Sequence, residues 1–112
     1  METIHERINF GEISKTVNTE KQNRHIRNSG AYLEGRSYLL DGIDPQGLVD
    51  RYHGTGEAKF TEAGRWKNKE LIDADRIIGI SINPATGEET ATKRFVIHYS
   101  KTGVHIVPAE RR

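Results

Sequence analysis

The last third of the chain alternates apolar and polar residues in three short segments, and this pattern limits the fold more than any other feature. The segments are RIIGISI (76–82), TKRFVIHYS (92–100) and VHIVP (104–108). They are rich in β-branched residues and are separated by the turn-forming strings NPATGEE and KTG, as antiparallel strands usually are. We therefore predict an antiparallel meander of three strands.

Helix signals lie upstream of these strands. TEKQNRHIR (19–27) is rich in helix formers, Thr19 is its expected N-cap, and NSG (28–30) ends it. Asp44 followed by Pro45 predicts a second helix that runs to about His53. The chain thus predicts an α+β domain in which N-terminal helices pack on an antiparallel β-sheet.

Three other stretches carry weaker signals. Residues 1–18 fit neither a helix nor a strand consistently, and residues 32–40 suit a short strand or an irregular run. Residues 58–71 are mixed and polar, and three of their side chains are expected to anchor them in the core: Phe60, Trp66 and Leu71.

Length and composition exclude several classes of protein. The 112 residues suit one domain, and the absence of cysteine excludes disulfides, thiolate metal sites and a cysteine nucleophile. The apolar runs are too short to span a membrane, and the N-terminus lacks the apolar core of a secretory signal. A net charge of +1 does not by itself indicate nucleic-acid binding, although from Lys93 onward there are five basic residues and one acidic residue.

The C-terminal hairpin concentrates side chains that could do chemistry, namely His98, Ser100, Lys101 and His105. Strand alternation predicts a core face on the first strand and a more polar face that carries His98 and Ser100. The expected core residues of that strand are Phe95, Ile97 and Tyr99.

The register of the hairpin decides whether its two histidines meet. A two-residue loop of Thr102 and Gly103 would pair Ser100 with His105 and place His98 and His105 on the same face. A three-residue loop would pair Ser100 with Val104 and separate the histidines. The sequence leaves both registers open.

A second candidate cluster lies on the predicted helix at 19–27. Lys21 and His25 are four residues apart and so point to the same side of a helix, with Arg24 and Arg27 adding positive charge. Cleavage of RNA through its 2′-hydroxyl needs a base, an acid and cations that stabilise the phosphate, and histidine can serve as acid or base near neutrality. These histidines and lysines would suffice for that reaction without a metal.

The structural interpretation of the same residues is the more common one. A single histidine on a strand is usually a half-buried packing residue, and Lys21 and His25 on an exposed helix would usually be solvated. Zinc ligation is disfavoured because a hairpin pair plus a distant helical histidine is not a recognised ligand spacing. Periodicity alone therefore favours structure over catalysis.

Three strings resemble one family. KQNRHI (21–26), DPQGLVDRYHGTG (44–56) and IHYSKTGVHIVPA (97–109) resemble the polymorphic toxin type 50 domain. The likeness extends from about Lys21 to Ala109. We expect residues 21–112 to form a ribonuclease toxin domain and residues 1–20 to be an N-terminal extension or linker remnant.

The resemblance implies a small, metal-independent endoribonuclease with a fold like that of barnase, EndoU, the tRNA-cleaving colicins and RelE. It implies RNA as the substrate, no cofactor, and a cognate immunity protein as the partner of a monomer, bound 1:1. The domain would be the C-terminal effector of a secreted or phage-associated protein and would act in the target-cell cytoplasm.

Site residues follow from the matching motifs. Lys21 and His25 match the Lys-Gln-x-x-His pattern of the family, and the hairpin matches its His-Tyr-Ser-Lys-x-Gly-x-His pattern. The expected catalytic residues are His25 and His105 as the acid–base pair, Lys21 and Lys101 at the phosphate, and His98 and Ser100 as orienting groups. The expected substrate-binding residues are Arg24, Arg27, Arg94 and Tyr99. The alternative is a non-catalytic module that binds a nucleic acid or a protein through its basic edge.

Overall fold

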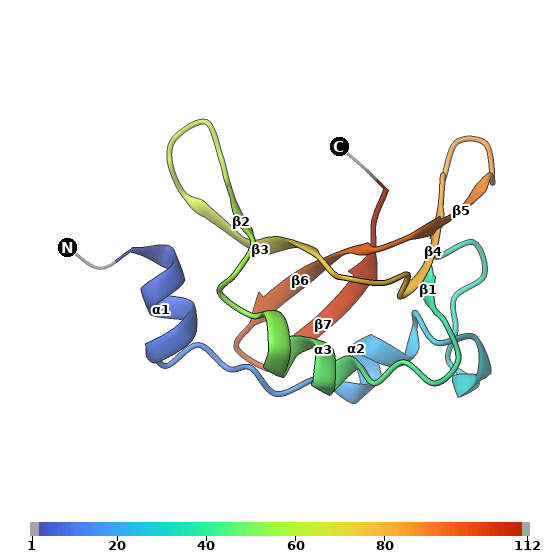
Figure 1. Cartoon of the computed structure of the whole chain (residues 1–112), viewed down its shortest axis with the longest axis horizontal. Coiled ribbons are helices and arrows are strands. Elements are labelled where there is room, and N and C mark those ends of the chain that lie inside the picture. Colours follow the sequence, from blue (N-terminus) through green and yellow to red (C-terminus); the bar gives the residue numbers. More distant parts are fainter. Residues whose placement is uncertain (1–2, 111–112) are drawn as a thin grey trace.

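Helices and loops cover one side of two antiparallel sheets in the computed structural model, which describes residues 3–110 (Figure 1). The helices are α1 (Ile4–Phe10), α2 (Thr19–Asn23) and α3 (Pro45–Tyr52), with a 3₁₀ turn η1 (Arg27–Ser29). The strands are β1 (Tyr38–Leu39), β2 (Glu57–Phe60), β3 (Trp66–Asp73), β4 (Gly79–Ile82), β5 (Glu89–Thr92), β6 (Arg94–Ser100) and β7 (Gly103–Pro108). The α+β class is confirmed, although α3 lies in the middle of the chain.

The predicted three-strand meander is wrong. The strands form two sheets, β1-β4-β5 and β2-β3-β6-β7, so β4 pairs with β5 and never with β6. The segment 92–100 is divided because the chain bends at Lys93 and passes from one sheet to the other. The Thr92 hydroxyl supports the bend, since it accepts the Arg94 N–H at 3.0 Å and donates to the Ala109 carbonyl at 2.7 Å.

The β2–β3 hairpin is absent from the sequence prediction. Its loop is closed by bonds between Thr61 and Arg65 and by Gly64, which has a φ of 84° that favours glycine. Most side chains of β2 and the first half of β3 are at least partly exposed, so these strands lack a clean apolar alternation. Phe60 is not a core anchor, because 49% of it is exposed.

The core lies between the sheets and the helices. Phe95, Ile97 and Tyr99 of β6 are buried, which confirms the predicted core face. α1 contributes the fully buried Ile8, and its start is fixed by a capping box between Thr3 and Glu6.

The two predicted helices differ in how well their bounds match. α3 has the predicted Asp44 cap and Pro45 start, and it ends at Tyr52. α2 is capped by Asn18, not Thr19, and it ends at Asn23 instead of Arg27. The early end follows from tertiary bonds, because the His25 carbonyl accepts the Leu39 N–H at 3.0 Å and the chain is extended at Ile26.

Among residues 3–110, no helix has the length and apolar character needed to cross a bilayer.

Candidate functional site

The β6–β7 hairpin brings its two histidines face to face. His98 pairs directly with His105, and Ser100 pairs with Gly103 across a two-residue loop of Lys101 and Thr102. This register is neither of the two considered from the sequence, but it places both histidines on one face. The imidazole centroids of His98 and His105 are 4.6 Å apart, with 15° between the ring planes.

Gly103 explains this register. Its φ of 117° is a conformation that side chains with a Cβ rarely adopt, and a Cβ there would lie 2.6 Å from the Thr16 carbonyl oxygen. The same carbonyl accepts the Val104 N–H at 2.9 Å. A glycine is therefore needed where β7 begins against the segment that precedes α2.

α2 docks on the open edge of β7 through Gln22. The Gln22 side-chain amide donates to the Ile106 carbonyl at 2.9 Å and accepts the Ile106 N–H at 2.7 Å. This pair of bonds satisfies strand groups that would otherwise lie unpaired at a sheet edge. It also fixes the end of α2, from which His25 follows.

His25 stacks on the far side of His105. Their ring centroids are 5.9 Å apart and the planes differ by 12°. His25 is 5% exposed, and its Nδ1 atom lies 2.8 Å from the Ser37 carbonyl oxygen. The three imidazoles form one stack, His25–His105–His98, with His105 in the middle; we call it the histidine stack.

Two lysines flank the histidine stack. The Lys21 ammonium donates to the hydroxyls of Ser100 at 3.3 Å and Thr102 at 3.2 Å. Lys69 of β3 pairs directly with His98, so it continues the row across the sheet. Sequence reasoning missed Lys69 because it missed the β2–β3 hairpin, for which the glycine at position 64 is a local turn signal.

The environment lowers the pKa of every histidine in the stack. Burial and the neighbouring charges of His105, Lys69 and His25 lower the pKa of His98 to about 4. Burial also lowers the pKa of His105 to about 4, with further effects from His25, Lys21 and Arg24. Burial likewise lowers the pKa of His25, while its bond to the Ser37 carbonyl acts in the opposite direction. The neutral imidazoles are therefore favoured at neutral pH.

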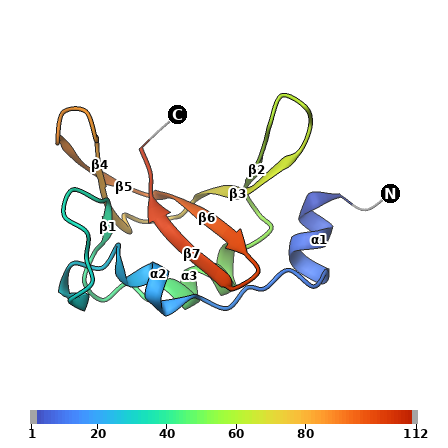
Figure 2. The ribbon, with the colours of Figure 1, turned by 180° about the vertical axis from the view of Figure 1, so that it is seen from behind.

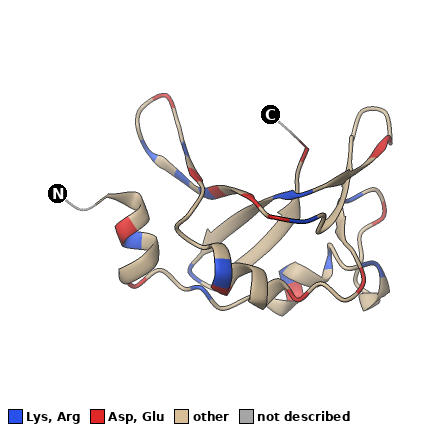
Figure 3. Ribbon diagram, in the orientation of Figure 1, with Lys and Arg blue, Asp and Glu red and all other residues tan. Residues whose placement is uncertain are grey.

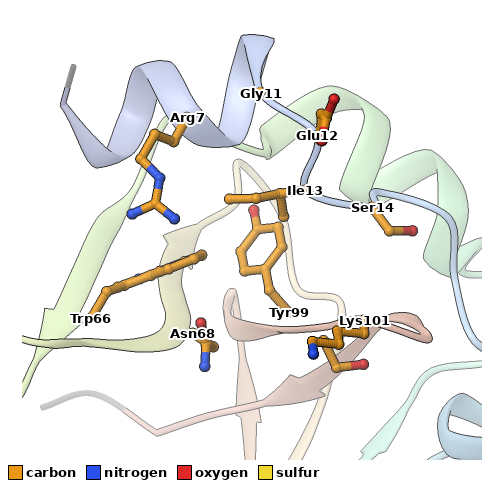
Figure 4. Close-up of a pocket in the computed structure, with 10 residues that line it drawn as sticks. Arg7, Gly11, Glu12, Ile13, Ser14, Trp66, Asn68, Tyr99 and Lys101 are labelled. Atoms are coloured by element: carbon orange, nitrogen blue, oxygen red, sulfur yellow. The ribbon is translucent and has the colours of Figure 1, made fainter.

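Lys101 lies in a different environment from Lys21. It lines a hollow of about 630 Å³ under α1, together with Arg7, Trp66, Asn68 and Tyr99 (Figure 4). Ser100 also lines this hollow, so it connects Lys101 with Lys21 around the hairpin turn.

The four expected substrate-binding residues do not gather at the stack. Arg24 is exposed and pairs with Glu20 at 3.8 Å, Arg27 lies 4.8 Å from the Tyr38 ring centre, and Arg94 bonds Asp73 at 2.9 Å. Of these three, Arg24 is close enough to affect the pKa of His105.

Tyr99 faces the core, away from the histidine stack. It is 5% exposed, and its hydroxyl donates to the carboxylate of Glu70 at 2.7 Å. Glu70 is fully buried and also accepts the N–H groups of Gly54 and Gly56 at 3.0 and 2.8 Å. This pair ties the end of α3 to the sheet beneath the site.

Within residues 3–110, no group of three or more His, Cys, Asp or Glu side chains has an arrangement that could hold a metal ion.

Comparison with known proteins identifies the family. Residues 17–108 match the family model described as bacterial toxin 50, which covers most of the chain and includes every residue of the histidine stack. No curated protein matches the chain. The chain therefore belongs to the bacterial toxin 50 family and is a polymorphic toxin domain.

Proposed function

We propose that this toxin domain is a metal-independent endoribonuclease that cleaves RNA by attack of the 2′-hydroxyl. The observation that carries the proposal is the histidine stack, which joins three imidazoles from two distant parts of the chain and is flanked by Lys21 and Lys69. A fold like that of barnase and RelE belongs to the same proposal, as does neutralisation by a cognate immunity protein. The domain would be delivered by a secreted or phage-associated protein and act in the target-cell cytoplasm.

His25 is the proposed general base. The Ser37 carbonyl oxygen can only accept a hydrogen bond, so the proton of the neutral ring sits on Nδ1 and the lone pair on Nε2. Nε2 takes the 2′ proton as the 2′ oxygen forms a bond to phosphorus. The bond from phosphorus to the 5′ oxygen breaks, which leaves a 2′,3′-cyclic phosphate.

His105 is the proposed general acid, and it gives its proton to the departing 5′ oxygen. Its pKa is lowered in the free protein, and a bound phosphate would raise it again because the anion favours the imidazolium. His98 stacks on the other face of His105 and orients it. Ser100 holds Lys21 near the hairpin turn, and Lys21 stabilises charge on the phosphate. Lys101 contacts the RNA on the other side of that turn.

The decisive experiment is an RNA cleavage assay in EDTA. We expect the purified domain to convert total RNA into discrete fragments without added metal. His25→Asn and His105→Asn should each lower the rate by about 10²- to 10⁴-fold, the usual range for losing a general acid or base. His5→Asn is the matched control, because His5 bonds the Gly56 carbonyl and lies outside the stack.

Other results would identify other functions. Parent-like cleavage by both variants would refute the proposed acid and base. A loss in His98→Asn as large as in His105→Asn would place the acid on His98. Binding of RNA without cleavage would indicate the binding module, and cleavage only with added divalent metal would indicate a metal nuclease.

A further inference from the structure

The outer face of the four-stranded sheet forms a concave surface between two hairpins. The β2–β3 and β4–β5 hairpins rise on the side of the sheet opposite to α2 and α3 (Figures 1 and 2). A hollow of about 720 Å³ lies between them, with Leu71 and Val96 among its lining residues. Residues 81–84 line it on the β4–β5 side. We call this surface the saddle.

The saddle is continuous with the histidine stack. Lys69 lines the saddle and pairs with His98 across the β3–β6 ladder. Val96 also lines the saddle and precedes His98 by two residues on the same strand, so both point to the same face. An RNA strand whose scissile phosphate lies at the stack must continue on both sides of it. The saddle is the concave surface that adjoins the stack on the Lys69 side.

The charge of the saddle suits a polyanion. Three lysines of the β2–β3 hairpin line it, Lys59, Lys67 and Lys69, against one acidic residue, Glu110. Basic segments occur on both strands of this hairpin (Figure 3, blue). Lys59 is paired with Glu57, and the other two lysines are exposed. Lysines along a groove neutralise the phosphates of a nucleic-acid strand.

The saddle also offers an aromatic surface. Phe60 lines it with 49% of its surface exposed, so its ring is available for contact with a ligand. Unpaired bases stack on exposed aromatic rings, whereas bases inside a duplex are covered by their neighbours. The combination of a basic wall and an exposed ring favours a single strand over a duplex.

We propose that the saddle binds a single-stranded stretch of RNA next to the cleaved bond, with Lys59, Lys67 and Lys69 at its phosphates and Phe60 stacked on a base. The identity of the ligand as substrate rests on the proposed ribonuclease function. The saddle thereby extends the site beyond the histidine stack and supplies affinity without base-specific contacts.

A binding assay with an RNA that the domain cannot cut tests this proposal. The probe is a short, fluorescently labelled, single-stranded oligonucleotide of mixed sequence with every ribose 2′-O-methylated, which removes the attacking hydroxyl. The triple variant Lys59→Gln, Lys67→Gln, Lys69→Gln should bind it more weakly. On a single strand each phosphate contact contributes about 0.7 to the slope of log affinity against log salt. The loss of three contacts should therefore make this slope shallower by about 2.

Matched variants control for net charge and for aromatic loss. The triple variant Arg51→Gln, Arg76→Gln, Lys93→Gln removes three exposed cations outside the saddle, one of them ion-paired like Lys59, and should keep the parent slope.

Phe60→Ala should weaken binding about tenfold, the scale of one lost base stack. Phe10→Ala removes an 85%-exposed ring on α1 and should leave binding unchanged. Circular dichroism confirms that each variant is folded.

The outcomes separate this proposal from the ribonuclease proposal. Parent-like affinity and slope in the saddle variants, an equal loss in the control variants, or no binding by the parent would overturn the saddle. If the parent binds the probe through the saddle but does not cut unmodified RNA, the ribonuclease mechanism fails while the saddle stands. If it cuts RNA and the saddle variants bind normally, the saddle alone fails.

Discussion

At the scale of single residues, the pH response of the site follows from the histidine environments. In the proposed mechanism His25 must be neutral and His105 must be protonated, so kcat/KM should be highest between the pKa values of these two residues. Both pKa values lie below the ordinary 6.5 because both rings are buried beside other positive groups. We therefore expect kcat/KM for RNA cleavage to be highest below pH 6.5, and a measured pH–rate profile checks this.

The pH profile of kcat/KM reports the pKa values of the free domain, whereas the profile of kcat reports those of its complex with the substrate. In the proposed mechanism the phosphate of bound RNA raises the pKa of His105, so the alkaline limb of kcat should lie at higher pH than that of kcat/KM. The variant His98→Asn removes the imidazole that stacks on His105 but keeps the proposed base, His25, and the proposed acid, His105. An optimum above pH 7 for kcat/KM would contradict these roles, since the free acid would then be almost fully deprotonated at its best pH.

At the scale of elements, the docking of α2 on β7 depends on one side chain. Gln22→Ala removes both hydrogen bonds to Ile106 and leaves two backbone groups of a buried strand without partners. Each such group costs about 1–3 kcal/mol, so we expect the two together to lower the free energy of unfolding by about 2–6 kcal/mol. Urea denaturation measures this loss, and RNA cleavage should fall with it because His25 follows α2.

Thr19→Ala is the control for this element. Thr19 is exposed on the same helix, so its replacement should change the unfolding free energy by no more than about 0.5 kcal/mol. A similar small change in Gln22→Ala would show that water replaces the amide and that α2 is held by other contacts.

The strands show what the alternation of apolar and polar residues can and cannot predict. It correctly separated the buried face of β6, with Phe95 and Ile97, from the face that carries His98. It could not give the partner of a strand, because β4 and β6 have similar apolar patterns but belong to different sheets. The β2–β3 hairpin was missed because its exposed strands have no apolar period to detect.

At the scale of the whole molecule, the site is assembled by long-range contacts that no local pattern contains. The sequence named His25, His98 and His105, but their stacking depends on the register at Gly103 and on the edge of β7. Lys101 was expected to act at the phosphate together with Lys21, and it lines the hollow under α1. The residue types were predictable from chemistry and family resemblance, whereas their mutual positions needed the fold.

The histidine stack also makes the stability of the whole domain depend on pH. In the unfolded chain each histidine has an ordinary pKa of about 6.5, whereas in the folded domain His98 and His105 have pKa values of about 4. Between these values the unfolded state binds more protons, so the free energy of unfolding falls as the pH falls from about 6.5 towards 4. Within this window each histidine adds up to about 1.4 kcal/mol per pH unit to the slope of the unfolding free energy against pH. Outside the window it adds nothing to that slope.

Urea unfolding at several pH values measures this dependence. His98→Asn with His105→Asn should flatten the curve between about pH 4 and 6.5, since the double variant lacks the two groups that take up protons on unfolding. His5→Asn is the control for the loss of a histidine, because it leaves both rings of the stack in place. An equal slope in the parent and the double variant would mean that the two rings titrate alike in both states, and the low pKa values of His98 and His105 would then be wrong.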